Sequence, residues 1–373
     1  MREYQICKKC VMDTSDPEIS FDDEGICTHC KSYMETEKKE LLKGDRAKAL
    51  LNELVEKIKK DGRRKKYDCI IGVSGGVDST YTAYLVKKLG LRCLAVHLDN
   101  GWNSELAVKN IENTLKKLGI DLFTYVIDWE EFRDIQVAFL KASTPDSEVP
   151  TDHAIVALLH LMAAKYDIKY IILGRNVTTE AVAVRSWSQG HGDWKYIRSV
   201  HRIYGEKRIR TFPHYGIMSF LYYRLVKKQS VIPILNYVNY VKEEAMGILQ
   251  NELGWKYYGG KHYESIYTRF FQAYILPKKF GFDKKRAHLS TLICSVQITR
   301  EKALEELKRN DYPSELMEAD REYVVKKLGM KMSDFDDIMT SPPKTFWDYP
   351  SYKKNPVFRM KSILELYHKI KMR

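Results

Sequence analysis

The stretch CIIGVSGGVDST, residues 69–80, joins an apolar run to a glycine-rich loop and decides the fold. The run at residues 69–73 has the length and composition of a buried parallel strand, and residues 80–89 have the amphipathic pattern of a helix. Two adjacent glycines, Gly75 and Gly76, can adopt positive φ and let backbone N–H groups approach a ligand. Unpaired amides at the start of the helix attract an anion. The stretch therefore predicts a strand, a phosphate-binding loop and a helix.

The loop differs from that of P-loop NTPases, because it lacks the lysine that completes their pattern. It resembles instead the S-G-G-x-D-S loop of the PP-loop ATP pyrophosphatases, in which pyrophosphate is held while the α-phosphate passes to a substrate oxygen as AMP. This resemblance implies ATP and Mg²⁺ as cofactors, with Asp78 as a catalytic, metal-binding carboxylate. The alternative is an ordinary glycine turn that opens a helix. The expected nucleotide contacts in the loop are Ser74, Gly75, Gly76, Val77, Asp78 and Ser79.

Strands and helices alternate after the loop. Further strands are predicted at residues 91–98, 122–127 and 170–173, and helices at residues 104–118, 129–140 and 154–166. Such alternation predicts an α/β domain with a doubly wound parallel sheet, of the PP-loop or HUP-like type, over residues 67–185. Ligands of these sheets bind at the carboxyl ends of the strands.

Polar residues follow three of the predicted strands. Asp99 can reach the ribose or base of a nucleotide, although an Asp before Asn-Gly is also a common turn former. Gly174 is expected to contact the nucleotide and Asn176 the substrate. Residues 144–153 are predicted to form a polar loop over the same strand ends, which makes Asp152 and His153 catalytic candidates. Asp152 is alternatively a helix N-cap.

The N-terminal region contains four cysteines in the pattern C-x₂-C-x₁₆-C-x₂-C: Cys7, Cys10, Cys27 and Cys30. This spacing suits a tetrahedral thiolate site and predicts a small zinc ribbon at residues 1–35 with structural Zn²⁺. An iron–sulfur cluster has the same spacing requirements, whereas paired disulfides are disfavoured in a cytosolic protein. Residues 36–66 are charged and have the pattern of a helical connector.

The whole chain has 373 residues, a formal net charge of +13 and no apolar run long enough to span a membrane. We therefore expect a cytoplasmic protein without a transmembrane segment, with anionic partners. Regular alternation is lost in the second half, and residues 186–373 are predicted to form a mostly helical substrate or lid domain. Its candidate substrate contacts are Lys261, Glu264 and Arg269, which are alternatively interdomain ion pairs.

Longer segments resemble the N-acetyl sugar amidotransferase family, the WbpG/PseA type of lipopolysaccharide O-antigen and related surface-sugar pathways. These segments are CKKCVMDTS at residues 7–15, residues 21–30, the loop at 74–79, DNGWNS at 99–104, DWEEF at 128–132, residues 150–155 and residues 261–272. The family implies conversion of an acetamido group on a sugar, often nucleotide-linked, into an acetamidino group. It also implies partner subunits that supply ammonia and resemble the glutaminase and barrel subunits of imidazole glycerol phosphate synthase. The sequence departs from the family pattern at Arg175, where an acidic residue is expected, and at Val296, where Gly is expected.

The implied reaction needs an activated substrate, because an amide carbonyl is a poor electrophile. Adenylation of its oxygen creates a leaving group, and ammonia then expels AMP. The rival interpretation is a PP-loop enzyme that thiolates or otherwise modifies tRNA. Such enzymes commonly need further catalytic cysteines, but Cys69 and Cys93 lie in predicted strands and Cys294 stands alone. A zinc-ribbon module that only binds nucleic acid leaves the nucleotide loop unexplained, so no nucleic-acid partner is expected.

Overall fold

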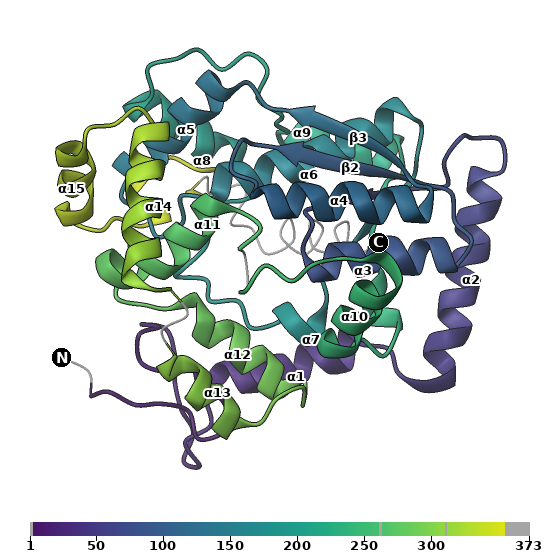
Figure 1. Ribbon diagram of the computed structural model, residues 1–373, viewed down its shortest axis with the longest axis horizontal. Helices are drawn as coiled ribbons and strands as arrows, with labels where there is room; N and C mark the ends of the chain where they lie inside the picture. The colour runs from purple at the N-terminus through teal and green to yellow at the C-terminus, as the bar shows by residue number, and fades with distance from the viewer. Residues whose placement is uncertain (1–2, 261–262, 310–311, 355–373) are drawn as a thin grey trace.

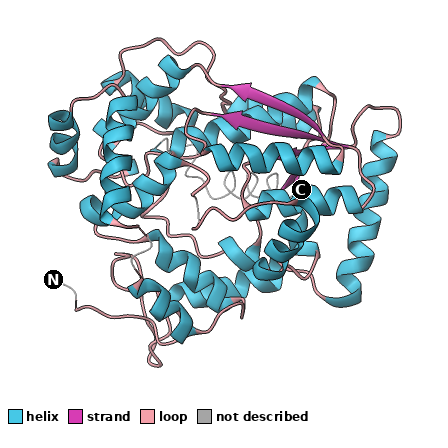
Figure 2. Ribbon diagram, viewed as in Figure 1, coloured by secondary structure: helices cyan, strands magenta, loops and turns pink. Residues whose placement is uncertain are grey.

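The computed structural model describes residues 3–260, 263–309 and 312–354. It contains a five-stranded parallel sheet in the order β3-β2-β1-β4-β5. Strands β2 and β3 are seen clearly in the upper part of Figures 1 and 2. The strands are β1 (Cys69–Gly72), β2 (Cys93–Asp99), β3 (Asp121–Val126), β4 (Tyr170–Leu173) and β5 (Ser230–Pro233). The chain reverses its direction of winding between β1 and β4, which is where open α/β sheets bind their ligands.

Helices cover both faces of the sheet because alternate strand residues point to opposite sides. Ile71 of β1 packs on one side in a core shared with α2 (Gly44–Gly62), α3 (Val77–Lys88) and α4 (Glu105–Leu118). Ile70 packs on the other side in a core shared with α5 (Trp129–Lys141) and α6 (Val149–Lys165). The predicted doubly wound α/β fold is confirmed.

Several element boundaries differ from the predictions. Helix α3 begins at Val77, so Asp78 lies in its first turn rather than in the loop. Helix α6 begins at Val149, and the prediction that residues 149–153 belong to a polar loop was wrong. Pro150 lies in the first turn of α6, where its missing N–H costs no helix hydrogen bond. Strand β5, which comes from the second half of the chain, was not predicted.

The remaining helices surround the sheet and are mostly short. They are α1 (Thr28–Glu40), α7 (Val177–Glu180), α8 (Trp194–Tyr204), α9 (Ile217–Leu221), η1 (Tyr222–Val226), η2 (Ile234–Tyr237), α10 (Lys242–Ile248), η3 (Leu249–Leu253), α11 (Ile266–Phe270), η4 (Phe271–Phe280), α12 (Lys284–Cys294), α13 (Arg300–Lys308), α14 (Ser314–Lys327), α15 (Met332–Thr340), η5 (Phe346–Asp348) and η6 (Tyr352–Lys354). The predicted helical character of the second half is confirmed over the described residues. Helix α1 contains the expected boundary between the cysteine-rich region and the connector.

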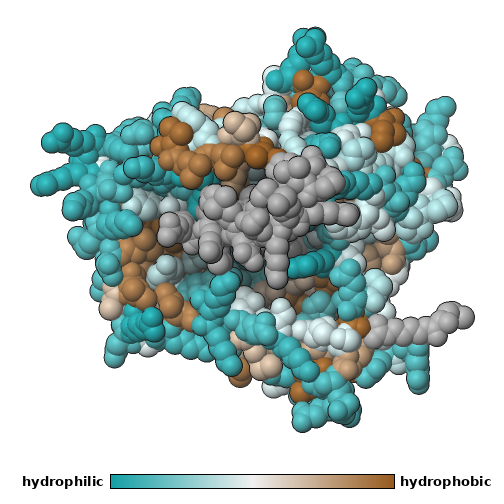
Figure 3. Space-filling model, turned by 180° about the vertical axis from the view of Figure 1, so that it is seen from behind, coloured by the Kyte–Doolittle hydropathy of each residue, from teal (hydrophilic) through white to brown (hydrophobic). Residues whose placement is uncertain are grey.

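Hydrophilic side chains cover most of the back face, and hydrophobic residues gather there in a few brown areas (Figure 3). Exposed apolar side chains include Met218 of α9 and Leu225 and Val226 of η1. Among the described residues, no helix combines the length and the hydropathy needed to span a bilayer.

The backbone at Val296, in the turn after α12, has a conformation that suits the Gly expected at this position. Val296 has a left-handed φ of 60° and is 90% exposed. A β-branched residue is strained in this region of φ/ψ space, whereas Gly is not. The turn is anchored on both sides, since the Ser295 hydroxyl donates to the Thr178 carbonyl at 2.8 Å and Gln297 Oε1 accepts from the Lys242 N–H at 3.0 Å.

We therefore expect Val296→Gly to raise the free energy of unfolding by about 1 kcal/mol, because it removes left-handed strain without removing packed atoms. Urea denaturation of the two proteins measures the difference. The control is Val108→Gly within α4, where φ is not left-handed and Gly should lower stability. A Val296→Gly protein less stable than the wild type contradicts the strain argument.

Candidate functional site

The glycine-rich loop adopts the geometry that its glycines permit. Gly75 has a left-handed φ of +82°, and a Cβ atom at this position would lie 2.8 Å from the carbonyl oxygen of Ala107. The Gly75 carbonyl accepts a hydrogen bond from Trp255 Nε1 at 2.9 Å. Gly76 is the N-cap of α3, so the first amides of the helix lie directly behind the loop. The loop therefore presents backbone donors at the positive end of a helix dipole.

The side chains of Ser74 and Ser79 make hydrogen bonds within the loop. Ser74 Oγ lies 3.1 Å from Ser79 Oγ and accepts from the Gly76 N–H at 3.3 Å. Ser79 Oγ also accepts from the Ser74 N–H at 3.2 Å. Ser74 is exposed at the rim of the loop. Both hydroxyls thus lie among the backbone amides that a bound phosphate would contact.

Gly174 brings the end of β4 against the start of α3. A Cβ atom at Gly174 would lie 2.8 Å from the carbonyl group of Asp78 and 2.9 Å from the Ser79 nitrogen. This close backbone approach requires Gly and places the loop after β1 beside the loop after β4. The neighbouring Arg175 is exposed.

Asp78 is held by two residues that the sequence analysis did not identify. The Tyr240 hydroxyl donates to Asp78 Oδ1, and the Thr179 hydroxyl donates to Oδ2 at 3.3 Å. Burial and the Asp78 carboxylate raise the pKa of Tyr240 far above its ordinary value, so Tyr240 is a neutral donor. Asn176 is buried, caps α7 and positions Thr179 by accepting from its N–H at 2.9 Å. Its expected contact with substrate stays a prediction.

The strand end after β2 forms a turn. Asp99 Oδ1 accepts from the Gly101 N–H at 2.9 Å and from Asn103 Nδ2 at 3.3 Å. Asp99 therefore forms a turn, as the alternative interpretation expects. Its contact with the nucleotide stays a prediction.

Glu264 and Arg269 have different environments. Glu264 Oε1 lies 3.5 Å from the position of a Cβ atom at Gly76, and its backbone carbonyl accepts from the Ser104 N–H at 2.8 Å. It therefore lies against the nucleotide loop. Arg269 makes a bidentate ion pair with Asp320 of α14, at 2.8 and 2.7 Å. This ion pair lies within the second half of the chain, so it is not the interdomain pair that was the alternative for Arg269, and a contact of Arg269 with substrate stays a prediction. Lys261 lies outside the described residues.

His153 is fully buried in the first turns of α6. Its Nε2 accepts from the Tyr215 N–H at 3.2 Å, and Nδ1 lies 2.7 Å from the His191 carbonyl. Burial lowers the pKa of His153 to about 4, which keeps the ring neutral at pH 7. Asp152 is more exposed and lies 3.3 Å from His191 Nε2. Their assignment as catalytic residues stays a prediction.

A mixed group of charged side chains lies next to Asp152, and we call it the Glu148 cluster: Asp146, Glu148, Asp152, His191 and Lys284. Asp146 is its buried centre, at 3.4 Å from His191 Nε2 and 3.5 Å from Lys284 Nζ. Burial opposes ionisation of Asp146, but Lys284 and His191 hold its pKa well below the usual value. Burial raises the pKa of Glu148 to about 8, an effect that Lys284 opposes and the neighbouring aspartates increase.

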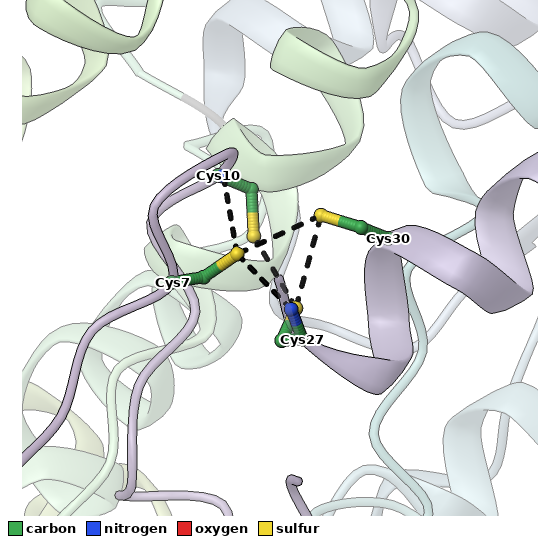
Figure 4. A group of neighbouring side chains, drawn as sticks. All are labelled: Cys7, Cys10, Cys27 and Cys30. Carbon is green, nitrogen blue, oxygen red and sulfur yellow. Dashed lines mark hydrogen bonds between the residues drawn. The ribbon is translucent and has the colours of Figure 1, made fainter. Parts of the chain in front are cut away.

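The four N-terminal cysteines converge as the sequence predicted (Figure 4). Their sulfur atoms all lie within 4.8 Å of one another, and all four side chains are buried. Hydrogen bonds from the neighbouring thiols, that of Cys10 first, lower the pKa of Cys7. Four buried thiols in this arrangement fit a tetrahedral metal ion.

The cysteine site packs on helices of the second half. Arg300 donates to the carbonyls of Cys7 and Cys10, at 2.9 and 3.0 Å. Arg286 of α12 pairs with Asp13 at 3.0 Å. Cys294, which stood alone in the sequence, lies with its sulfur 3.8 Å from that of Cys30. The site therefore joins the N-terminal region to α12 and α13.

Sequence reasoning missed residues that reach the site from far along the chain. These are Thr179, Tyr240, Trp255, His191 and Lys284. No local pattern marks them. Asp146 and Glu148 could have been identified from the sequence, because they lie in the same acidic stretch as Asp152.

Two family models match separate parts of the chain. Residues 264–365 match the C-terminal domain of WbpG-like LPS biosynthesis proteins, and residues 47–181 match NAD synthase. The matches confirm the resemblance identified from the sequence. The chain combines a domain of the PP-loop superfamily with a WbpG-like C-terminal domain, and the PP-loop domain supports an ATP-using enzyme that forms C–N bonds.

Comparison with individual proteins finds relatives of low sequence identity or short coverage. The uncharacterised protein MJ1599 of Methanocaldococcus jannaschii is 24% identical over 315 residues, which are 84% of this chain and 96% of that protein. The tRNA-specific 2-thiouridylase MnmA 2 of Fusobacterium nucleatum is 31% identical over 144 residues, 36% of this chain and 39% of that enzyme. The structure of NMN synthetase from Francisella tularensis is 15% identical and covers 55% of this chain and 95% of its own, with a TM-score of 0.29.

Proposed function

We propose that this protein is an ATP-dependent amidotransferase that converts the acetamido group of a nucleotide-linked sugar into an acetamidino group for surface-polysaccharide biosynthesis. The observation that carries the proposal is the contact between its two matched domains. Glu264, the first residue of the WbpG-like match, has its carboxylate 3.5 Å from the Cβ position at Gly76 of the nucleotide loop. The family-specific domain thus begins at the point where ATP would react.

In the first step, the acetamido oxygen attacks the α-phosphorus of ATP and pyrophosphate leaves. The backbone amides at Gly75 and Gly76 and the hydroxyls of Ser74 and Ser79 would hold the departing pyrophosphate. Bound Mg²⁺ would neutralise phosphate charge, with Asp78 as the carboxylate suited to hold it. Tyr240 and Thr179 fix the orientation of that carboxylate.

In the second step, ammonia attacks the imidoyl carbon. A C–N bond forms, the nitrogen loses a proton, and the C–O bond to AMP breaks to leave the amidine. No protein nucleophile is required. Water must be kept away from the activated amide, and the WbpG-like domain beside the loop is suited to exclude it.

Ammonia is proposed to come from partner subunits, a glutaminase and a barrel subunit like those of imidazole glycerol phosphate synthase. Cys69 and Cys93 are buried in strands, and burial raises the pKa of Cys93 to about 12. Cys294 lies beside the four-cysteine site. None of these thiols is placed to hydrolyse glutamine. The four-cysteine site is proposed to hold structural Zn²⁺, because its four ligands all come from protein.

The alternative is tRNA thiolation, which the partial match to a tRNA 2-thiouridylase favours. The burial of Cys69 and Cys93, and the position of the half-buried Cys294 beside the four-cysteine site, argue against it, since sulfur transfer needs an accessible thiolate. A net charge of +13 fits either a nucleotide-linked sugar or RNA and does not discriminate.

The experiment supplies the purified protein with ATP, Mg²⁺ and a panel of UDP-linked acetamido sugars. With a high concentration of ammonium, we expect an amidine product whose mass falls by the difference between an oxygen atom and an NH group. Glutamine in place of ammonium should give no product until the ammonia-supplying subunits are added. Turnover with glutamine alone, or thiolation of tRNA with no reaction of any acetamido sugar, contradicts the proposal.

A further inference from the structure

The Glu148 cluster contains one carboxyl group more than its cations can balance. Lys284 and His191 are the cations, because contacts with Asp146 raise the pKa of both against the cost of burial. Asp146 and Asp152 are the aspartates beside them. These four charges already sum to zero when all are ionised. Ionisation of Glu148 would leave the cluster with a net negative charge, so this group is poised to hold and release a proton.

Glu148 is connected to α11 through a hydroxyl. Thr268 Oγ1 contacts Glu148 Oε1 and lies 2.9 Å from Ser265 Oγ. A threonine hydroxyl has one proton, so it can donate to only one of these two oxygens at a time. When Glu148 is neutral, it donates to Thr268 and Thr268 donates to Ser265. When Glu148 is ionised, Ser265 donates to Thr268 and Thr268 donates to Glu148.

The far end of this chain of hydroxyls lies beside the nucleotide loop. Ser265 follows Glu264, whose carboxylate lies 3.5 Å from the position of a Cβ atom at Gly76, and its backbone pairs with that of Asn103 in the segment after β2. Ser265 Oγ accepts the Thr268 N–H at 3.2 Å as the N-cap of α11. When Glu148 is ionised and Ser265 donates to Thr268, one acceptor position on this oxygen stays open. A nitrogen nucleophile near the loop can donate a proton there.

We propose that Ser265, Thr268 and Glu148 form a proton relay that receives the proton lost by the nitrogen nucleophile during amidine formation. The relay rests on the proposed function. As the C–N bond forms, the nitrogen gives a proton to Ser265, Ser265 passes its own to Thr268, and Thr268 passes its own to Glu148. The electron pair of the breaking C–O bond leaves with AMP. Glu148 later releases its proton to solvent.

The test separates the two halves of the reaction. Adenylation is measured as exchange of labelled pyrophosphate into ATP that depends on a UDP-linked acetamido sugar, and amidine formation is measured with ammonium. Glu148→Gln and Thr268→Val should lower amidine formation about 100-fold, a typical loss for a proton-transfer group. Exchange should stay within about threefold of the wild type, because the relay acts after adenylation. Thr268→Ser, which keeps the hydroxyl, should recover most of the rate.

Thr340→Val is the matched control. Thr340 is an exposed threonine at the end of α15 whose hydroxyl bonds only to carbonyls of its own helix, at 3.0 and 3.2 Å. Its replacement should change neither half-reaction. Normal amidine formation in both Glu148→Gln and Thr268→Val overturns the relay. Absence of sugar-dependent exchange in the wild type overturns the proposed function instead.

The pH dependence gives a further readout. The base form of Glu148 exists above its pKa of about 8, so the rate should rise as pH increases through this value and the rise should vanish in Glu148→Gln. Hydroxylamine is the suitable nucleophile, because it is already unprotonated in this range.

Infrared difference spectra of the protein alone test the relay without any substrate. A carboxyl band that is absent in Glu148→Gln and shifted in Thr268→Val supports the hydrogen-bonded pair that the relay needs, and a Glu148 band that Thr268→Val leaves unchanged overturns it.

Discussion

Replacing Gly75 with Ala should reduce ATP-dependent turnover by about 1,000-fold or more, because the substitution both strains and displaces the amides that hold pyrophosphate. The left-handed φ of +82° disfavours any residue with a Cβ atom, and that atom would lie 2.8 Å from the Ala107 carbonyl oxygen. Helix α4 or the loop must therefore move. Release of pyrophosphate and AMP measures the loss.

The matched control is Gly44→Ala. Gly44 also has a left-handed φ, +66°, but a Cβ atom there would meet no other atom within 4 Å. Both variants should lose about 1 kcal/mol of stability from the left-handed strain, whereas only Gly75→Ala should lose activity. A Gly75→Ala enzyme with turnover near that of the wild type means that phosphate is not held at this loop.

Replacing Cys27 with Ser should remove the bound metal and unfold the N-terminal region. The free energy of metal binding at such sites contributes directly to the free energy of folding, and it is of the order of 10 kcal/mol for structural zinc. The effect should extend further, because Arg300 and Arg286 tie the cysteine site to α12 and α13. Helix α12 begins at Lys284 of the Glu148 cluster, so metal loss should also lower activity. Elemental analysis and thermal unfolding measure both losses.

Cys294→Ser is the control for that experiment. The Cys294 sulfur is 3.8 Å from that of Cys30, but the four-cysteine group already completes a tetrahedral set without it. This variant should keep about one zinc ion per chain, as expected for a structural site of four thiolates. Iron in anaerobically purified protein would contradict the zinc assignment, and metal loss in Cys294→Ser would show that Cys294 is a ligand.

The sheet could be predicted from the sequence where hydrophobic runs were continuous. Strand β4 was predicted at its observed bounds. For β1, the predicted strand extended one residue beyond the observed end at Gly72. Strand β5 escaped prediction because Ser230–Pro233 is a short edge strand that is only partly buried. Its position in the sheet depends on pairing with β4, about 60 residues earlier, and a local pattern contains no such information.

The candidate site was predictable in its local parts only. The loop and the four cysteines were found because their function depends on closely spaced residues. Tyr240 lies 162 residues from Asp78, and Lys284 lies more than 100 residues from Asp146, so only the fold brings these pairs together. The start of α6 was misjudged because the polar composition of residues 144–153 indicated a loop, although the first turn of a helix accepts both polar residues and Pro.

The central claim is that ATP activates an amide oxygen by adenylation. An acetamido sugar labelled with ¹⁸O in its carbonyl group tests it most directly, because the labelled oxygen is the atom that attacks the α-phosphorus. After turnover with ATP and ammonium, mass spectrometry of the nucleotide products should find the label in AMP, with unlabelled pyrophosphate in equal amount. Label in inorganic phosphate accompanied by ADP, or label that stays in the sugar, would contradict the account.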